Sequence, residues 1–174
     1  MARKLAQAPR LSTPFPRTQI ARQLETAAGL VAAGVSAPVI KVSHGSFDTH
    51  AQQRGRQDRL LAELAEALSA FRAAMQEAGT WDRVLILTYS EFGRRAGENG
   101  SRGTDHGTAA PHLLLGGRVI GGLYGQQPSL THLVDADLGY HVDYRSLYAT
   151  VARGWWGIRD PLFSKRYPPI ECLT

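Results

Sequence analysis

The sequence RVLILTYSEFGRRAGENGSRGTDHG, residues 83–107, contains the features that decide the expected fold. Its first part, Val84–Leu87, is a continuous apolar run that predicts a buried strand. Because the run does not alternate with polar residues, it is typical of a parallel sheet that is covered on both faces. The chain then becomes polar, and ten of the 18 glycines lie between Gly93 and Gly125. Glycine is dense where a backbone turns sharply or approaches a ligand closely.

Helices are predicted on both sides of this stretch. The first begins after Thr18, a residue type that caps helices, and ends at Gly34. A long helix is expected over residues 57–78, where apolar side chains recur at helical spacing. A last helix is expected over residues 143–156, after an aspartate that can cap it.

Two further apolar runs complete the predicted sheet. Residues 39–42 (VIKV) are rich in β-branched side chains, and residues 113–115 (LLL) precede two glycines. The order helix, strand, helix, strand, loop, strand, helix is typical of an α/β domain. We therefore expect a layered α/β/α fold with a mostly parallel sheet over residues 18–174. Residues 1–17 form a basic arm with three prolines, which we expect to bury little surface.

The composition narrows the classes of partner. Hydrophobic residues make up 43% and charged residues 20%, which excludes a disordered or collagen-like chain. The net charge of +5 comes from the first 22 residues, so no basic face is indicated and we expect no nucleic-acid partner. The apolar runs are only a few residues long, so we expect no membrane span. The single cysteine, Cys172, can form neither an internal disulfide nor a cysteine-based metal site.

Three polar clusters flank the predicted strands. The Asp-Thr-His sequence at 48–50 follows the strand over 39–42, residues 90–94 (SEFGR) follow the strand at 84–87, and residues 103–107 (GTDHG) precede the next strand. In α/β sheets, ligands bind at the carboxyl ends of the strands, so we expect these clusters to meet at one edge. Carboxylates together with imidazoles suit zinc, manganese or a similar divalent ion. The candidate ligands at this edge are Asp48, His50, Glu91, Asp105 and His106.

Each cluster also fits a structural role. An Asp-x-His pair is also the pattern of a capping aspartate followed by a surface histidine. Glu91 also suits a solvated carboxylate paired with a neighbouring arginine. Asp105 also suits a residue that stabilises a turn. It ranks below Glu91 as a candidate ligand because it is adjacent to His106, and adjacent side chains in an extended segment point in opposite directions. His112 stands beside an apolar run, which is more typical of a core histidine than of a ligand.

Several common functional motifs are absent from the sequence. It contains no GxGxxG, GxxxxGK[ST], GxSxG or HExxH motif. The sequence therefore contains no motif that indicates a dinucleotide-dependent enzyme, a P-loop protein or a serine hydrolase.

Three stretches closely resemble one known family: residues 47–50 (FDTH), residues 87–107 and residues 143–150 (DYRSLYAT). On these motifs the chain is identified as a member of the domain of unknown function 1501 family, with a resemblance that runs from about Thr13 onward. That family is grouped with the alkaline phosphatase and sulfatase-like superfamily. The resemblance implies an alkaline-phosphatase-like core and a metal-dependent hydrolase that acts on small anionic phosphate or sulfate esters.

The resemblance also implies roles for individual residues. Glu91 stands where the superfamily places a metal-binding aspartate, and it faces a second metal site on this analogy. Arg94 is the candidate for assisting on the anion, and Glu91 and Arg94 are the two catalytic candidates. The first metal site, for zinc or manganese, is formed on this analogy by Asp48, His50 and His106.

Two departures from the superfamily pattern leave two hypotheses open. Phe92 occupies the place of a histidine of the second metal site, and no serine or threonine matches the expected nucleophile. The chain therefore looks like the C-terminal portion of a longer protein. The first hypothesis is a metal-dependent hydrolase, or a fragment of one. The second is a non-catalytic metal- or ligand-binding scaffold that keeps the fold.

Overall fold

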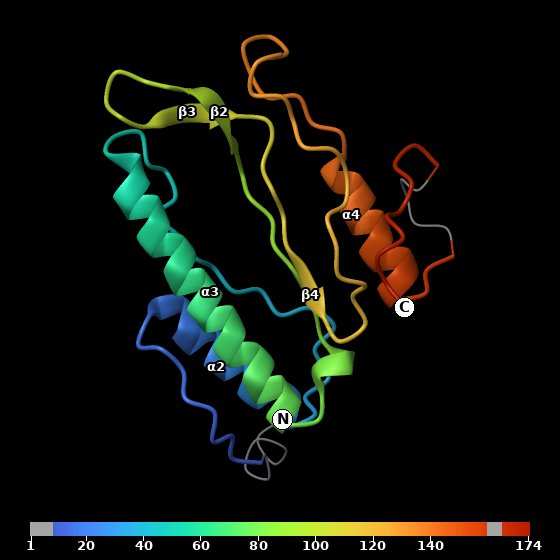
Figure 1. Cartoon of the computed structure of the whole chain (residues 1–174). Helices are drawn as coiled ribbons and strands as arrows, with labels where there is room; N and C mark the ends of the chain where they lie inside the picture. The colour runs from blue at the N-terminus through green and yellow to red at the C-terminus, as the bar shows by residue number, and fades with distance from the viewer. Residues whose placement is uncertain (1–8, 160–164) are drawn as a thin grey trace. The chain divides into compact units, whose positions relative to one another are not determined.

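The computed structural model describes residues 9–159 and 165–174 and is drawn in Figure 1. The described chain forms two compact units: the first runs up to Val84 and includes Gly100–Gly103, and the second comprises Leu85–Asn99 and the chain from Thr104 onward. In chain order the elements are α2 (Gln19–Ala32), α3 (Gln53–Glu77), η1 (Trp81–Arg83), β1 (Leu85–Leu87), β2 (Gly93–Glu98), β3 (Thr104–Gly107), β4 (Leu114–Gly116), α4 (Tyr144–Thr150) and η2 (Val151–Trp155).

The core of the first unit is the pair of helices α2 and α3, which pack against each other. Their apolar stripes supply its buried side chains, among them Ile20 and Leu24 of α2 and Leu60, Phe71 and Met75 of α3. A buried aliphatic or aromatic side chain of this size contributes roughly 1.5–3 kcal/mol relative to an exposed one. Both predicted helices are therefore confirmed, although Leu61 in the apolar stripe of α3 is 47% exposed.

Local signals fix three of the helix ends. The hydroxyl of Thr18 accepts a hydrogen bond from the N–H of Ala21 at 3.3 Å, which caps the start of α2 as predicted. Beyond the C-terminal ends, Gly34 and Gly79 adopt φ angles of 65° and 64°, a left-handed conformation that glycine adopts at little cost. Both helices thus end where the sequence predicts.

The start of α3 lies four residues before the predicted residue 57 and has a non-local cause. No side chain caps this end, and Gln52 has a left-handed φ of 47°. The backbone N–H groups of Gln52 and Gln53 instead donate to the carbonyls of Ser101 and Arg102, each at 3.0 Å. The loop from 100 to 103 therefore supplies acceptors for N–H groups that no preceding helical turn could satisfy.

The second unit contains two separate antiparallel ladders. β1 pairs with β4, with Leu85 opposite Gly116 and Leu87 opposite Leu114, and β2 pairs with β3. The predicted α/β/α fold with a mostly parallel sheet, and with it the alkaline-phosphatase-like core, is therefore wrong for the described residues.

The reason for this error lies in burial and pairing. All three positions of β1 are half-buried, rather than covered on both faces. A continuous apolar run indicates that its side chains avoid water, but it does not specify which strand pairs with it. Residues 39–42 form no strand, and Val39 is 67% exposed. The strand expected over 113–115 is found one residue later, as β4.

The glycine-rich stretch after β1 forms the β2–β3 hairpin, which was not predicted. Gly93 lies opposite Gly107 in this ladder. A Cβ atom on Gly93 would lie 2.0 Å from the carbonyl oxygen of Ala109, and one on Gly107 would lie 2.6 Å from the Asp137 carboxylate. Glycine at these two positions therefore serves close backbone packing.

The last predicted helix begins as expected. The Asp143 carboxylate accepts a hydrogen bond from the N–H of Arg145 at 2.9 Å and pairs with the Arg145 guanidinium at 2.6 Å. These bonds lower the pKa of Asp143 to about 2. After α4, the π-helical turn η2 carries the helical path to Trp155, so the predicted extent is confirmed although the last turn is not α-helical.

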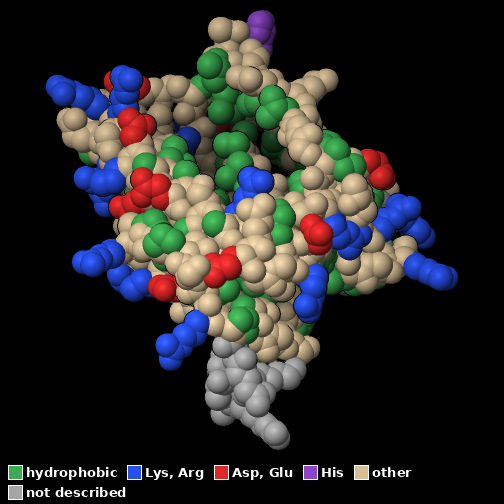
Figure 2. All heavy atoms as spheres, turned by 60° about the horizontal axis from the view of Figure 1, so that its bottom comes forward, with side chains coloured by type: hydrophobic (Ala, Val, Ile, Leu, Met, Phe, Trp, Pro, Cys, Tyr) green, Lys and Arg blue, Asp and Glu red, His purple; other side chains and the backbone are tan. Residues whose placement is uncertain are grey.

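In the described part of the chain, no helix is long and apolar enough to cross a membrane, as the sequence predicts. Figure 2 shows Lys and Arg side chains interspersed with Asp and Glu over the face that it draws. The expectation about nucleic acid stays a prediction.

Residues 9–17, the described part of the predicted arm, contain no helix or strand but are anchored to α3. Ser12 and Thr13 each donate a hydroxyl and a backbone N–H to the Glu77 carboxylate, over distances of 2.7–3.0 Å. The Thr13 hydroxyl and the two Ser12 donors are the main reasons why the pKa of Glu77 falls from 4.5 to about 2. Residues 9–17 are thus held to the first unit by hydrogen bonds to the Glu77 carboxylate.

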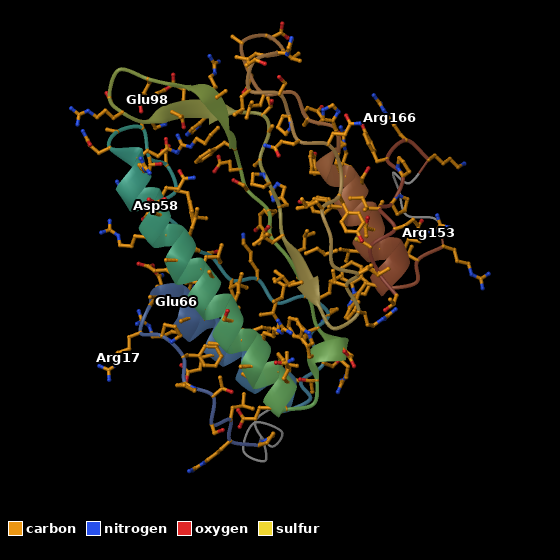
Figure 3. All side chains as sticks on the ribbon, viewed as in Figure 1. Arg17, Asp58, Glu66, Glu98, Arg153 and Arg166 are labelled. Carbon is orange, nitrogen blue, oxygen red and sulfur yellow. The ribbon has the colours of Figure 1, made fainter. Side chains whose placement is uncertain are left out.

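Replacing Glu77 by glutamine is expected to lower the melting temperature at pH 7, because a neutral amide accepts weaker hydrogen bonds than a carboxylate. Since folding depresses the pKa of Glu77, the stability that its carboxylate contributes is present above pH 4.5 and is lost as the pH falls toward 2. Thermal melts followed by circular dichroism should therefore show the difference in melting temperature between the variant and wild type shrinking over this range. Glu66→Gln, at another exposed carboxylate of α3 (Figure 3), is the control and should change little at any pH. A difference that persists at pH 2 would contradict this origin.

Candidate metal centre

The centre begins with a short segment just before α3, in which the side chain of Thr49 is buried and those of Asp48 and His50 are exposed. Thr49 is 1% exposed, and its N–H donates to the carbonyl of Phe47 at 2.9 Å. The side chains of Asp48 and His50 remain 65% and 47% exposed and form an ion pair, with 2.9 Å between Asp48 Oδ1 and His50 Nε2.

The loop that caps α3 also contacts this segment. Gly103 packs so closely on the backbone of His50 that a Cβ atom on Gly103 would lie 2.4 Å from the carbonyl carbon and oxygen of His50. Only glycine permits this approach without a backbone shift. β3 begins at the next residue, Thr104.

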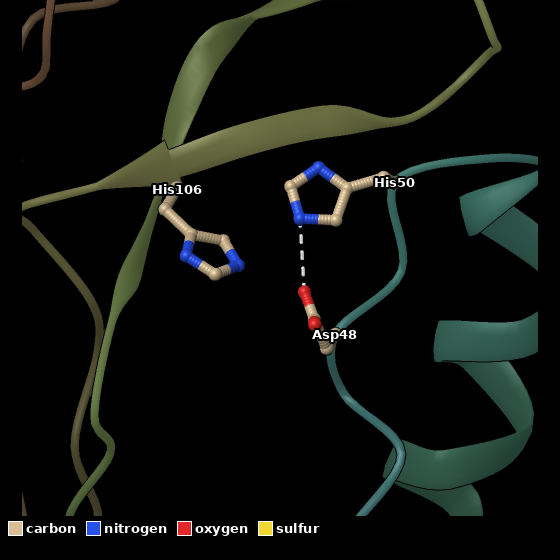
Figure 4. A group of neighbouring side chains, drawn as sticks. All are labelled: Asp48, His50 and His106. Carbon is tan, nitrogen blue, oxygen red and sulfur yellow. Dashed lines mark ion pairs between the residues drawn. The ribbon is translucent and has the colours of Figure 1, made fainter.

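Asp48, His50 and His106 each offer one ligand atom, and these atoms all lie within 4.8 Å of one another. Figure 4 draws the three side chains. The structure therefore groups the three side chains that the resemblance assigns to the first metal site.

The donor set fits a divalent metal. One carboxylate and two imidazoles are a common ligand set of zinc, whose bonds of about 2.0–2.1 Å place tetrahedral ligand atoms about 3.3 Å apart. The three side chains that offer these atoms are all exposed.

Two further side chains surround His106 on the β2–β3 hairpin. In the antiparallel register Arg94 lies opposite His106, and Phe92 precedes Arg94 by two residues, so period-2 alternation places all three side chains on one face. The rings of Phe92 and His106 are stacked, with centroids 3.7 Å apart and an interplanar angle of 6°. The Arg94 guanidinium carbon lies 5.0 Å from the centroid of the Phe92 ring.

The other candidate residues have different places. Glu91 is exposed in the segment between β1 and β2, and it is not a member of the three-residue group. Asp105 is also outside the group and accepts a hydrogen bond from the Asn99 amide at 3.3 Å. Arg94 donates to the carbonyl of Thr104 within the hairpin. His112 is half-buried, and burial lowers its pKa despite a hydrogen bond with the Thr88 backbone, as expected of a core histidine.

Sequence reasoning missed two residues that shape this centre. Gly103 has a sequence signal, a glycine just before the Thr-Asp-His run, but its partner is the distant backbone of His50. Phe92 was read as the replacement of a metal ligand, and its contact with His106 becomes visible only once the hairpin register is known.

These features define a protein of mixed helices and short antiparallel ladders with an exposed candidate metal centre. Residues 2–156 match the family described as "Protein of unknown function (DUF1501)". The chain therefore belongs to this family, as its motifs predict. No curated protein and no solved structure matches the chain.

Replacing Gly103 by alanine is expected to destabilise the protein by about 1–3 kcal/mol, because the added methyl group overlaps the His50 carbonyl and forces the backbone apart. Urea unfolding measures this loss. Gly100→Ala in the same loop is the matched control: no atom lies within 4 Å of a Cβ there, and its effect should stay within about 0.5 kcal/mol. Equal losses in the two variants would show that the contact with His50 is unimportant.

Proposed function

We propose that this protein is a divalent-metal-dependent hydrolase of small phosphate or sulfate esters, with zinc or manganese bound by Asp48, His50 and His106. The observation that carries the proposal is the convergence of one carboxylate and two imidazoles, from two distant parts of the sequence, within 4.8 Å on an exposed surface.

The residues of the centre suit this chemistry. A divalent ion at such a site polarises an ester oxygen and lowers the pKa of water from 15.7 to about 7, which provides a nucleophile at neutral pH. Asp48 holds negative charge next to the imidazole of His50, which favours cation binding at this point. Arg94 shares the hairpin face of His106 and is the cationic side chain suited to hold the ester anion.

The ester class rests on the sulfatase-like resemblance of the sequence motifs. The ligand set by itself favours a hydrolytic metal but does not select phosphate over sulfate. Glu91 remains a candidate for a further ligand or for orienting an imidazole once a metal is bound.

A metal-binding scaffold without turnover is the second candidate function. It is favoured by Phe92, whose apolar ring lies against His106 where the resemblance places a ligand of a second metal. Loss of the second metal would remove one of the two charges that clamp a transferring group in two-metal sites.

Metal binding is the first test. In calorimetric titrations with zinc and manganese, His106→Ala and Asp48→Asn are each expected to lower metal affinity at least roughly 10–100-fold, because each removes a ligand. His132→Ala, which removes an exposed imidazole hydrogen-bonded within its own loop, is the control and should bind as wild type does. Absence of divalent-ion binding by wild type, or equal binding by all variants, would refute the metal centre.

Hydrolysis is the second test. With zinc or manganese added, 4-nitrophenyl phosphate or 4-nitrophenyl sulfate should be hydrolysed, and chelation or His106→Ala should abolish the reaction. Arg94→Gln should lower kcat/KM roughly tenfold or more, because hydrogen bonds between charged groups contribute about 1.5–3 kcal/mol. Arg95→Gln, at an exposed arginine on the opposite face of the strand, is the control. Tight metal binding without turnover of either ester would favour the scaffold.

A further inference from the structure

The contact between Phe92 and His106 is unusually close and flat. Aromatic pairs in proteins commonly have centroids about 4.5–7 Å apart in offset or edge-to-face arrangements. Here the centroids are 3.7 Å apart and the ring planes differ by 6°. One face of the His106 imidazole is therefore covered by the phenyl ring, although His106 as a residue is exposed.

The hairpin fixes this contact. Because Gly93 pairs with Gly107 and Arg94 with His106, Phe92 is the diagonal neighbour of His106 on the same face of the ladder. Diagonal neighbours are about 7–8 Å apart at the backbone, which large aromatic side chains can span. The Ser90 hydroxyl donates to the carbonyl of Phe92 at 2.7 Å and holds the backbone just before β2.

The stack involves the face of the His106 ring and not its metal-binding nitrogen atoms. The lone pair of an imidazole nitrogen lies in the plane of the ring and points outward from its edge, whereas Phe92 covers the face. Coordination and stacking therefore use different parts of the same ring. Coordination also withdraws electron density from the imidazole, and the negative face of a phenyl ring stabilises an adjacent positive group.

We infer that Phe92 is a positioning residue for the metal centre: its stacked ring restricts the orientation of the His106 imidazole. An exposed histidine without such a contact samples several rotamers, and metal binding must then overcome the loss of that freedom. The stack restricts the ring before the metal arrives, as hydrogen-bonded partners of metal-binding histidines do. This inference rests on the proposed function, since it assigns Phe92 a role in the same site.

Three variants test the inference by calorimetric zinc titration. Phe92→Leu removes the ring and is expected to lower zinc affinity about tenfold. Phe92→Tyr keeps the ring and should bind within about twofold of wild type. Tyr148→Leu, which breaks the edge-to-face pair of Tyr144 and Tyr148 on α4, is the control and should leave zinc affinity unchanged.

A double variant separates positioning from general destabilisation. If Phe92 acts through His106, Phe92→Leu should cause no further loss of affinity in the His106→Ala background. An additive tenfold loss there, or a Phe92→Tyr variant as weak as Phe92→Leu, would overturn the inference.

The metal-free protein provides an independent measurement. The ring current of Phe92 should shift the imidazole C–H proton resonances of His106 upfield, and this shift should vanish in Phe92→Leu and persist in Phe92→Tyr. If wild type and Phe92→Leu bind zinc equally well, the inference about Phe92 is overturned and the proposed function is not. A wild-type protein that binds no divalent ion overturns the proposed function, and with it the role of Phe92.

Discussion

The contact between the loop at 100–103 and the start of α3 is the constraint on which the candidate site depends. The N–H groups of Gln52 and Gln53 lie at a helix end that lacks a side-chain cap, and the carbonyls of Ser101 and Arg102 accept from them. Gly103 can then approach the His50 backbone, because it has no Cβ atom to collide with the carbonyl. One backbone interaction thus satisfies the helix end and sets the point from which β3 departs.

The candidate centre combines residues from separate parts of the sequence. Thr49 is buried, whereas the side chains of Asp48 and His50 are exposed. These two residues and His106 each offer one ligand atom, and the three atoms lie within 4.8 Å of one another. On the β2–β3 hairpin, the Phe92 ring stacks on the imidazole of His106.

Two short ladders replace the single sheet that the apolar runs suggest. Each strand of the β1–β4 ladder has three half-buried residues and one antiparallel partner, rather than the two covered faces of a central parallel strand. The glycine-rich stretch is ordered by backbone proximity, with Gly93 and Gly107 facing each other across the second ladder. The many glycines therefore correctly indicated that other atoms pack closely on the backbone. At Gly93 and Gly107 these atoms belong to the chain itself and not to a ligand.

By itself, the sequence determined what depends on neighbouring residues. The cap at Thr18, the left-handed glycines at 34 and 79, and the start of α4 at Asp143 all act within a few residues of the chain. The family membership was also evident from the sequence motifs. Only the tertiary structure decided which strands pair, where α3 begins and why Phe92 lies against His106. The backbone partners concerned lie from 6 residues apart (Glu98 and Thr104) to 49 residues apart (Gln52 and Ser101), and hydrophobic pattern does not specify which of them pair.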